Sequence, residues 1–158
     1  MKASIRKSNI EDSKFIMSMI HELALFEKAP DQVILTEDQL IRDGFTENKL
    51  FESIILECDD VPVGMALFYF RYSTWKGKSL YLEDLIVKSE MRGRGLGKLA
   101  FKWPARFAVD NTCHRFEWQV LDWNEPAIGF YKAMGCQLDG EWINCRLEGI
   151  EIKDYLQT

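Results

Sequence analysis

The segment that most restricts how this chain of 158 residues can fold is an apolar run followed directly by a glycine-rich stretch. Residues 80–87, LYLEDLIV, have the length and composition of a buried β-strand. Residues 92–98, RGRGLGK, place glycine at every second position, where ordering the backbone is costly. Residues 98–111, KLAFKWPARFAVDN, then indicate a helix. The sequence therefore predicts a strand, a glycine loop and a helix in direct succession.

A loop of this kind favours an anion. A glycine turn that leads into a helix presents N–H groups without helical partners, and the helix dipole adds positive potential. Arg92, Arg94 and Lys98 add charge that suits a pyrophosphate. The alternative is that the glycines only turn the chain. Two familiar phosphate loops are excluded, because Lys98 replaces the third glycine of a dinucleotide fingerprint and Leu99 replaces the Ser or Thr of a Walker loop.

The rest of the chain alternates between strand-like and helix-like segments, with no repeat or linker, so we expect one domain spanning residues 1–158. The pattern predicts an α/β (α+β) fold with a mixed sheet and helices packed on it. Strands are expected at 3–7 (an edge strand), 51–58, 61–72 and 115–121, with one or two more around 142–150. Helices are expected after Asn9, after Thr36 and from Asn124 to Gly135, and the pair Asp59-Asp60 predicts a hairpin. Pro104 should kink or end the helix after the glycine loop.

Composition and charge argue against several classes of protein. A formal net charge of -5 argues against a general nucleic-acid binder. The four cysteines are far apart and only two histidines accompany them, so no metal site is expected. No apolar run approaches the ~20 residues that span a bilayer, and the N-terminus lacks the apolar region of a signal peptide. We therefore expect a cytoplasmic protein with no membrane partner.

The loop pattern R-G-x-G-x-G after a strand resembles the acyl-CoA signature of the GNAT family of N-acetyltransferases. Three further stretches, FEK…DQVILTE (26–37), YSTWKGKSLYLEDLIV (72–87) and LDWNEPAIGFYKAMG (121–135), resemble the spermidine/spermine (diamine) acetyltransferases. They look closest to the branch that acetylates thialysine. The resemblance runs from Ile5 to about Trp142. It implies the GNAT fold, a mostly antiparallel central sheet flanked by helices, with acyl-CoA in the cleft between the two central strands.

The resemblance also implies acetyl-CoA as cosubstrate and no metal. The pyrophosphate would lie on the glycine loop, and the pantetheine would pair with the preceding strand like an added strand. The residues implied in coenzyme binding are Leu85, Ile86, Val87, Arg92, Gly93, Arg94, Gly95, Leu96, Gly97 and Lys98, with Asn124, Pro126 and Tyr131 on the other side.

Acyl transfer to an amine needs a neutral nucleophile, and an amine with a pKa near 10.4 is only about one part in 2,500 neutral at pH 7. Glu83 and Asp84 are adjacent on the central strand. Strand alternation predicts that they point to opposite faces, so at most one enters a given cleft. The resemblance assigns Glu83 as the base, directly or through a water, and Tyr131 as the acid that protonates the departing thiolate. The alternatives are two solvated charges and a tyrosine of the core.

The resemblance points to an amine pocket of carboxylates and aromatic rings. Carboxylates attract a second ammonium, and the rings line the alkyl chain. Ser73-Thr74 replaces an acidic residue and a proline of the polyamine branch, which favours thialysine, lysine-like amino acids or short diamines over long polyamines. The alternative is the edge of a hydrophobic core. The pocket residues implied are Phe26, Glu27, Trp75, Glu83 and Asp84, with Glu117, Trp118 and Gln119 as further candidates.

The sequence thus predicts an acetyl-CoA-dependent N-acetyltransferase that acts on a small primary amine by direct transfer in a ternary complex. The resemblance further implies a homodimer. Two alternatives stay open, namely a non-catalytic acyl-CoA-binding or regulatory module on the same fold, and acetylation of a protein lysine or N-terminus.

Overall fold

The computed structural model describes residues 1–157 of the chain. The chain divides into two compact units, Met1–Gln119 and Val120–Thr158. The expectation of one domain over residues 1–158 stays a prediction. Within residues 1–157, no helix is both long enough and apolar enough to cross a bilayer.

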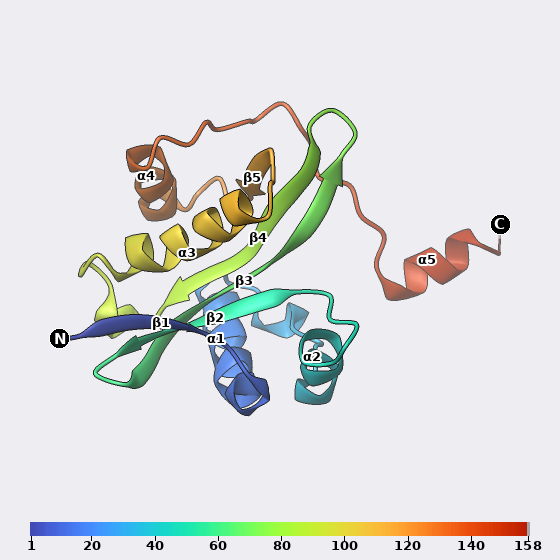
Figure 1. Ribbon diagram of the computed structural model, residues 1–158. Helices are drawn as coiled ribbons and strands as arrows, with labels where there is room; N and C mark the ends of the chain where they lie inside the picture. The colour runs from blue at the N-terminus through green and yellow to red at the C-terminus, as the bar shows by residue number, and fades with distance from the viewer. Residues whose placement is uncertain (158) are drawn as a thin grey trace. The chain divides into compact units, whose positions relative to one another are not determined.

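The first unit is built on a five-stranded sheet with the order β1-β2-β3-β4-β5 (Figure 1). The first three pairings are antiparallel and the last, between β4 and β5, is parallel. This confirms the predicted mixed, mostly antiparallel sheet, with the first strand at its edge. The strands are β1 (Ala3–Lys7), β2 (Glu52–Cys58), β3 (Val61–Ser73), β4 (Gly77–Val87) and β5 (Arg115–Trp118).

The predicted hairpin between β2 and β3 is confirmed. Asp59 and Asp60 have φ values of 49° and 63°, in the left-handed region. A two-residue hairpin loop of type I′ requires positive φ at both positions, and Asp tolerates this conformation better than most residues. The fourth strand starts earlier than expected, at Gly77, and β5 ends earlier, at Trp118.

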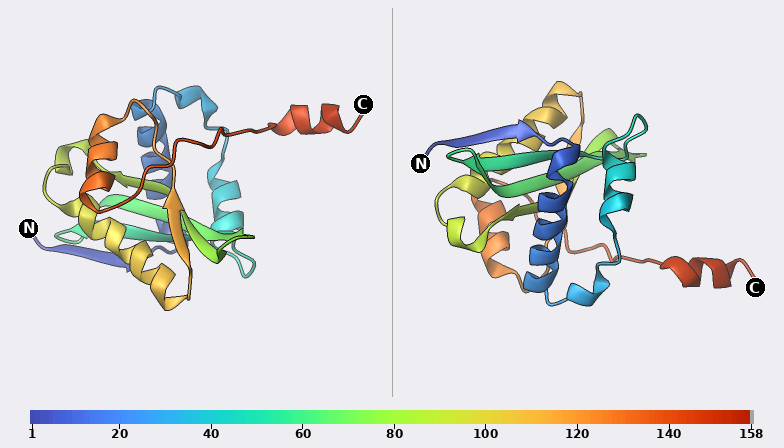
Figure 2. Two further views of the ribbon diagram at one scale, coloured as in Figure 1. Left: turned by 90° about the horizontal axis from the view of Figure 1, so that it is seen from above. Right: turned by 90° about the horizontal axis from the view of Figure 1, so that it is seen from below.

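Helices cover both faces of the sheet. The helices α1 (Ser13–Phe26) and α2 (Glu37–Gly44) lie on one face and α3 (Leu96–Asp110) lies on the other (Figure 2). On the first face a core cluster joins α1 and α2 to Met65 of β3 and Ile86 of β4. Thr36 forms the predicted capping box with Gln39, while Asn9 caps the short turn η1 (Ile10–Asp12) that leads into α1. Two further short turns are η2 (Pro30–Gln32) and η3 (Ser89–Met91).

The opposite face packs aromatic rings against α3. The ring of Phe68 on β3 lies 5.8 Å from that of Trp103 and 5.2 Å from that of Phe107. Pro104, which lies between Trp103 and Phe107 in the sequence, is fully buried. Of the two expected effects of Pro104, a kink or an end, the end does not occur, because the helix continues through Pro104 to Asp110. The kink stays a prediction. Packing on the sheet compensates for the one hydrogen bond that a proline removes.

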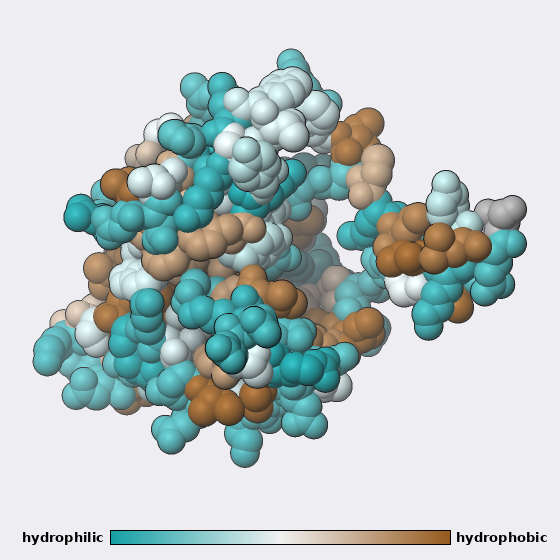
Figure 3. All heavy atoms as spheres, turned by 45° about the vertical axis from the view of Figure 1, so that its right-hand side comes forward, coloured by the Kyte–Doolittle hydropathy of each residue, from teal (hydrophilic) through white to brown (hydrophobic). Residues whose placement is uncertain are grey.

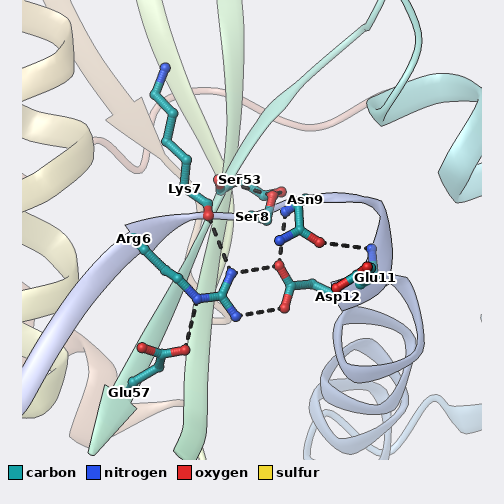
Figure 4. A network of polar contacts seen from close by, with 8 residues as sticks. All are labelled: Arg6, Lys7, Ser8, Asn9, Glu11, Asp12, Ser53 and Glu57. Atoms are coloured by element: carbon teal, nitrogen blue, oxygen red, sulfur yellow. Dashed lines mark hydrogen bonds and ion pairs between the residues drawn. The ribbon is translucent and has the colours of Figure 1, made fainter. Parts of the chain in front are cut away.

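An ion-pair network ties the start of α1 to the sheet (Figure 4). The guanidinium of Arg6 donates to both carboxylate oxygens of Asp12, at 2.7 and 2.8 Å, and to Oε1 of Glu57 at 2.7 Å. The hydrogen bond from Arg6 holds the pKa of the buried Asp12 below its usual value. The backbone N–H of Asn9 also donates to Asp12. This network links β1, β2 and α1, and its role is structural.

The second unit contains α4 (Glu125–Ala133) and α5 (Gly149–Tyr155). The predicted cap of α4 is confirmed, since the Asn124 side chain accepts a hydrogen bond from the Ala127 N–H at 3.3 Å. Gly135, which has a φ of 83°, follows the helix as expected.

The expectation of strands around residues 142–150 is wrong. No strand occurs among residues 120–157, and Glu148 and Glu151 form a capping box that starts α5 instead. A strand needs a neighbouring strand to pair its backbone, and residues 142–150 have none. Figure 3 shows hydrophobic side chains on the surface of this C-terminal segment, where Ile150 and Leu156 are exposed.

Candidate active site

A β-bulge at Glu83 shapes the centre of β4. Asp84 pairs with Leu67 and Leu82 pairs with Phe68, which leaves Glu83 without an opposite residue on β3. The hydroxyl of Tyr69 donates to Oε2 of Glu83 at 2.8 Å. Tyr69 shares a face of the sheet with Leu67, the partner of Asp84. Both carboxylates therefore lie on the same face, and the expectation that they point to opposite faces is wrong because the bulge interrupts the alternation.

Three carboxylates interact on this face. The pKa of the half-buried Asp84 is raised to about 7, mainly by loss of hydration and further by the negative charges of Glu83 and Glu27. Burial also raises the pKa of Glu27, which directly follows α1. An ammonium group bound here would relieve the repulsion among the carboxylates. The cluster is thus suited to hold a cationic amine, and Asp84 titrates where a general base is most useful.

Two tyrosines extend the site along the sheet, and sequence reasoning missed both. The rings of Tyr69 and Tyr81, which are paired across β3 and β4, lie 5.4 Å apart. Burial raises the pKa of each, and the charge of Glu83 contributes in both cases. Both phenols are therefore protonated donors at neutral pH. The pairing of Ser73 with Gly77 sets the register that places these side chains beside Glu83, and no pattern within a single strand shows that register.

The opposite end of this face is cationic. The Arg71 guanidinium lies 5.5 Å from the centre of the Tyr81 ring, and its Nη1 lies 3.2 Å from Oε1 of Glu117. Arg115 Nε lies 2.8 Å from Oε2 of the same carboxylate. Glu117, predicted for the amine pocket, is thus held by two guanidiniums. Trp118 points to the other face, where its ring lies 5.0 Å from that of Phe101 on α3.

The remaining pocket candidates lie apart from the carboxylates or at their edge. Trp75 lies at the tip of the hairpin between β3 and β4 and is 81% exposed, so this chain does not bring it to Glu83. Phe26 lies at the end of α1 beside Glu27, and the Arg92 guanidinium stacks 5.3 Å from its ring centre. Gln119 directly follows β5. The roles of these side chains in binding stay predictions.

The edge of β4 opens beyond the bulge. The parallel pairing with β5 ends at Leu82 and Trp118, whereas β4 continues to Val87 and pairs there with β3 only. In the part of the chain that the structure describes, no strand pairs with the second edge of residues 85–87. An extended ligand with amide groups can add to such an edge as a strand does. The predicted coenzyme residues Leu85, Ile86 and Val87 lie at this edge.

The glycine loop follows β4 and begins α3. Gly93 and Gly95 have φ values of 73° and 78°, and Gly95 is the residue that caps the helix. A Cβ at either glycine would meet no atom within 4 Å. These glycines are therefore required by backbone conformation, and space is free beside them. Leu96 is buried and anchors the helix, while Gly97 and Lys98 lie in its first turn.

The two arginines of the loop brace it. Arg92 Nε donates to the carbonyl of Val87 at 2.9 Å, and Arg94 Nη2 donates to the carbonyl of Glu90 at 3.2 Å. Both guanidiniums thus donate hydrogen bonds to backbone carbonyls of the same chain, and their positive charge stays at the loop. Together with the N–H groups of the first helical turn, the loop offers an anion site.

The predicted acid lies in the second unit. Tyr131 on α4 is 8% exposed, and its ring lies 5.1 Å from that of Phe130. Asn124 caps the same helix and Pro126 lies in its first turn. The roles of these three residues toward the coenzyme stay predictions. Among residues 1–157 no group of three or more His, Cys, Asp or Glu side chains is arranged to hold a metal ion.

An open strand edge, a glycine loop at a helix start and a carboxylate cluster are the features expected of an acyltransferase that uses an acyl-CoA. The model of the acetyltransferase (GNAT) family matches residues 17–136, and the chain belongs to this family. It is 40% identical over 162 residues to a thialysine N-epsilon-acetyltransferase of Sus scrofa, covering 95% of both chains. It is 36% identical to spermidine/spermine N(1)-acetyltransferase-like protein 1 of Homo sapiens, covering 83% of this chain and 20% of that protein.

A solved aminoglycoside N-acetyltransferase in complex with CoA superposes with a TM-score of 0.75 at 18% identity, covering 94% of this chain and 96% of the other. At this identity the likeness shows the fold alone. The family resemblance and the fold predicted from the sequence are both confirmed.

The loop geometry gives a first prediction. Gly95→Val is expected to weaken the binding of coenzyme A about tenfold or more, because a β-branched residue resists positive φ and its side chain fills the space beside the loop. Titration calorimetry with coenzyme A measures this. Gly140→Val is the matched control, since Gly140 also has open space around it but no positive φ. Unchanged affinity in a folded Gly95 variant would leave the glycines as turn formers only.

Proposed function

We propose that this protein transfers the acetyl group of acetyl-CoA to a primary amine of a small diamine, polyamine or lysine-like amino acid such as thialysine, by direct transfer in a ternary complex. The observation that carries the proposal is the bulge at Glu83, which gathers two carboxylates on one face of β4 where its edge opens. The thialysine and spermidine/spermine names of the relatives support an amine of this class.

In this proposal the coenzyme binds along the open edge of β4 and over the glycine loop. The backbone of residues 85–87 pairs with the pantetheine amides, and the N–H groups at the start of α3 hold the pyrophosphate. Acetyl-CoA supplies an activated thioester when bound. The match to the acetyltransferase (GNAT) family supports this cosubstrate.

The amine binds at Glu27, Glu83 and Asp84 in this proposal. Glu83 takes a proton from the ammonium, directly or through a water, and Asp84 is the second candidate because its pKa is about 7. The neutral amine attacks the thioester carbonyl, and Tyr131 returns a proton to the sulfur that leaves. No covalent intermediate on the protein is needed.

We also infer a homodimer from the family resemblance and a cytoplasmic location from the four free cysteines. The oligomeric state is read directly by light scattering during size-exclusion chromatography.

The proposed function is tested by thiol release from acetyl-CoA with a panel of amines. Thialysine, lysine and short diamines are expected to give a higher kcat/KM than spermine, because Ser73 and Thr74 supply no carboxylate at the hairpin. Spermine as the best substrate would overturn this preference. Tight binding of coenzyme A without release by any small amine or peptide would indicate a non-catalytic module. Release only with peptides would indicate a protein lysine or N-terminus as acceptor.

A further inference from the structure

Charge is divided along one face of the sheet. Glu27, Glu83 and Asp84 form the acidic end, and the charges of Glu83 and Glu27 both act on Asp84. Arg71 and Arg115 form the cationic end around Glu117. A diamine has no use for the cationic end, since guanidinium groups repel an ammonium. The division therefore favours a substrate that carries an anionic group at a fixed distance from its reactive amine.

The cationic end has unused binding capacity. Two guanidiniums share the single carboxylate of Glu117, so positive charge is in excess among these three side chains. Arg115 Nε and Glu117 Oε1 are buried, and neither has a hydrogen-bond partner among residues 1–157. The contacts of these two atoms within the cluster are therefore ion pairs without hydrogen-bond geometry. The Arg71 side chain is 55% exposed and so is accessible to a ligand. A carboxylate is the ligand that a guanidinium fork binds best.

We propose that Arg71 binds the α-carboxylate of an amino-acid substrate whose terminal amine is held at Glu83 and Asp84. This inference rests on the proposed acetyltransferase function and names a specificity-determining residue for it.

The spacing along β3 supports this assignment. Tyr69, which holds Glu83, and Arg71 are two residues apart on one face, which corresponds to roughly 6.8 Å along the strand. Six single bonds separate the terminal nitrogen of lysine from its carboxylate carbon, and in an extended chain they span roughly 7 Å. The rings of Tyr69 and Tyr81 lie between the two ends and can line the methylene chain.

The test compares three amines that differ only in the groups at one end. L-lysine carries both the α-carboxylate and the α-ammonium, 6-aminohexanoate carries the carboxylate alone, and cadaverine carries the ammonium alone. Arg71→Gln is expected to lower kcat/KM about 10- to 100-fold for lysine and for 6-aminohexanoate, because a charge-assisted hydrogen bond is lost. With cadaverine kcat/KM should stay the same or rise.

Two further variants serve as controls. Arg71→Lys keeps the charge and should retain part of the preference for the carboxylate. Arg106→Gln removes an exposed arginine of α3 that pairs with Asp110, and it should leave all three amines unaffected.

The outcomes separate this inference from the proposed function. An equal fall of kcat/KM for all three amines, or no fall for any, would overturn the role of Arg71 while the acetyltransferase activity stands. Wild-type protein that acetylates none of the three amines, nor thialysine, would overturn the proposed function and this inference with it.

Discussion

Tyr131→Phe is expected to lower kcat by roughly 10²–10⁴, the usual contribution of one proton-transfer group. The change removes one hydroxyl and keeps the ring, so the packing against Phe130 is retained. A thiol titrates near 8.5 and a phenol near 10, so a tyrosine is a reasonable donor to a departing thiolate. Initial rates of thiol release with acetyl-CoA and thialysine at saturating concentrations measure the change in kcat.

The affinity for coenzyme A and the midpoint of thermal unfolding should change little in this variant. Tyr72→Phe is the matched control, because Tyr72 is 76% exposed on β3 and its hydroxyl has no assigned role. Turnover of the Tyr131 variant equal to that of the control would show that solvent or another group protonates the sulfur.

Much of the fold could be predicted from local sequence signals. The strand, loop and helix around the glycines, the Asp59-Asp60 hairpin and the Thr36 capping box are all determined by residues close in the chain. Pro104 does not end its helix, because that effect depends on packing against the sheet. The strands expected near residues 142–150 required a partner strand, which no local pattern can supply.

The candidate site was predicted in its residues more than in its geometry. Glu83 and Asp84 were identified from an apolar run that contains two charges. Strand alternation predicted the wrong faces for them, because a bulge is visible only in the pairing of two strands and not in the sequence of one. Arg71, Tyr69 and Tyr81 were missed because their proximity depends on the register between two strands. Side chains that meet across strands are outside the reach of a pattern within one segment.

The second large effect concerns which carboxylate acts as the base. If Glu83 is the base, Glu83→Gln should lower kcat/KM by roughly 10²–10⁴ at pH 7 and recover part of the loss towards pH 10, where more amine is already neutral. If Asp84 is the base, wild-type kcat/KM should rise through about pH 7 as Asp84 ionises, and Asp84→Asn should remove that rise. Profiles of kcat/KM from pH 5 to 10 for the wild type and both variants measure this.

The electrostatic interaction between Glu83 and Asp84 helps to decide which of the two is the base. The charge of Glu83 contributes to the raised pKa of Asp84, so Glu83→Gln should lower that pKa and shift the acidic limb of the profile to lower pH. A shifted limb with retained activity would identify Asp84 as the base and Glu83 as a positioning residue. A fall at neutral pH with recovery at high pH, and no shift, would identify Glu83. Loss of activity in the Glu83 variant with neither a shift nor recovery would leave Glu83 binding the amine without deprotonating it.

The pH dependence of the free energy of unfolding serves as the control that the Asp84 variant is folded. The pKa of Asp84 is about 7 in the folded protein and near 3.8 in the unfolded chain, so the folded state binds more protons between these values. The free energy of unfolding should therefore fall as pH rises from about 4 to 7, and the cost of the buried charge is fully present above pH 7. Asp84→Asn removes that cost, and at pH 8 the variant should be more stable than the wild type by about 1–3 kcal/mol. Urea unfolding at pH 5 and pH 8 measures the difference. If the difference in free energy of unfolding between the variant and the wild type is as large at pH 5 as at pH 8, ionising the buried Asp84 carboxyl does not destabilise the fold, contrary to this prediction.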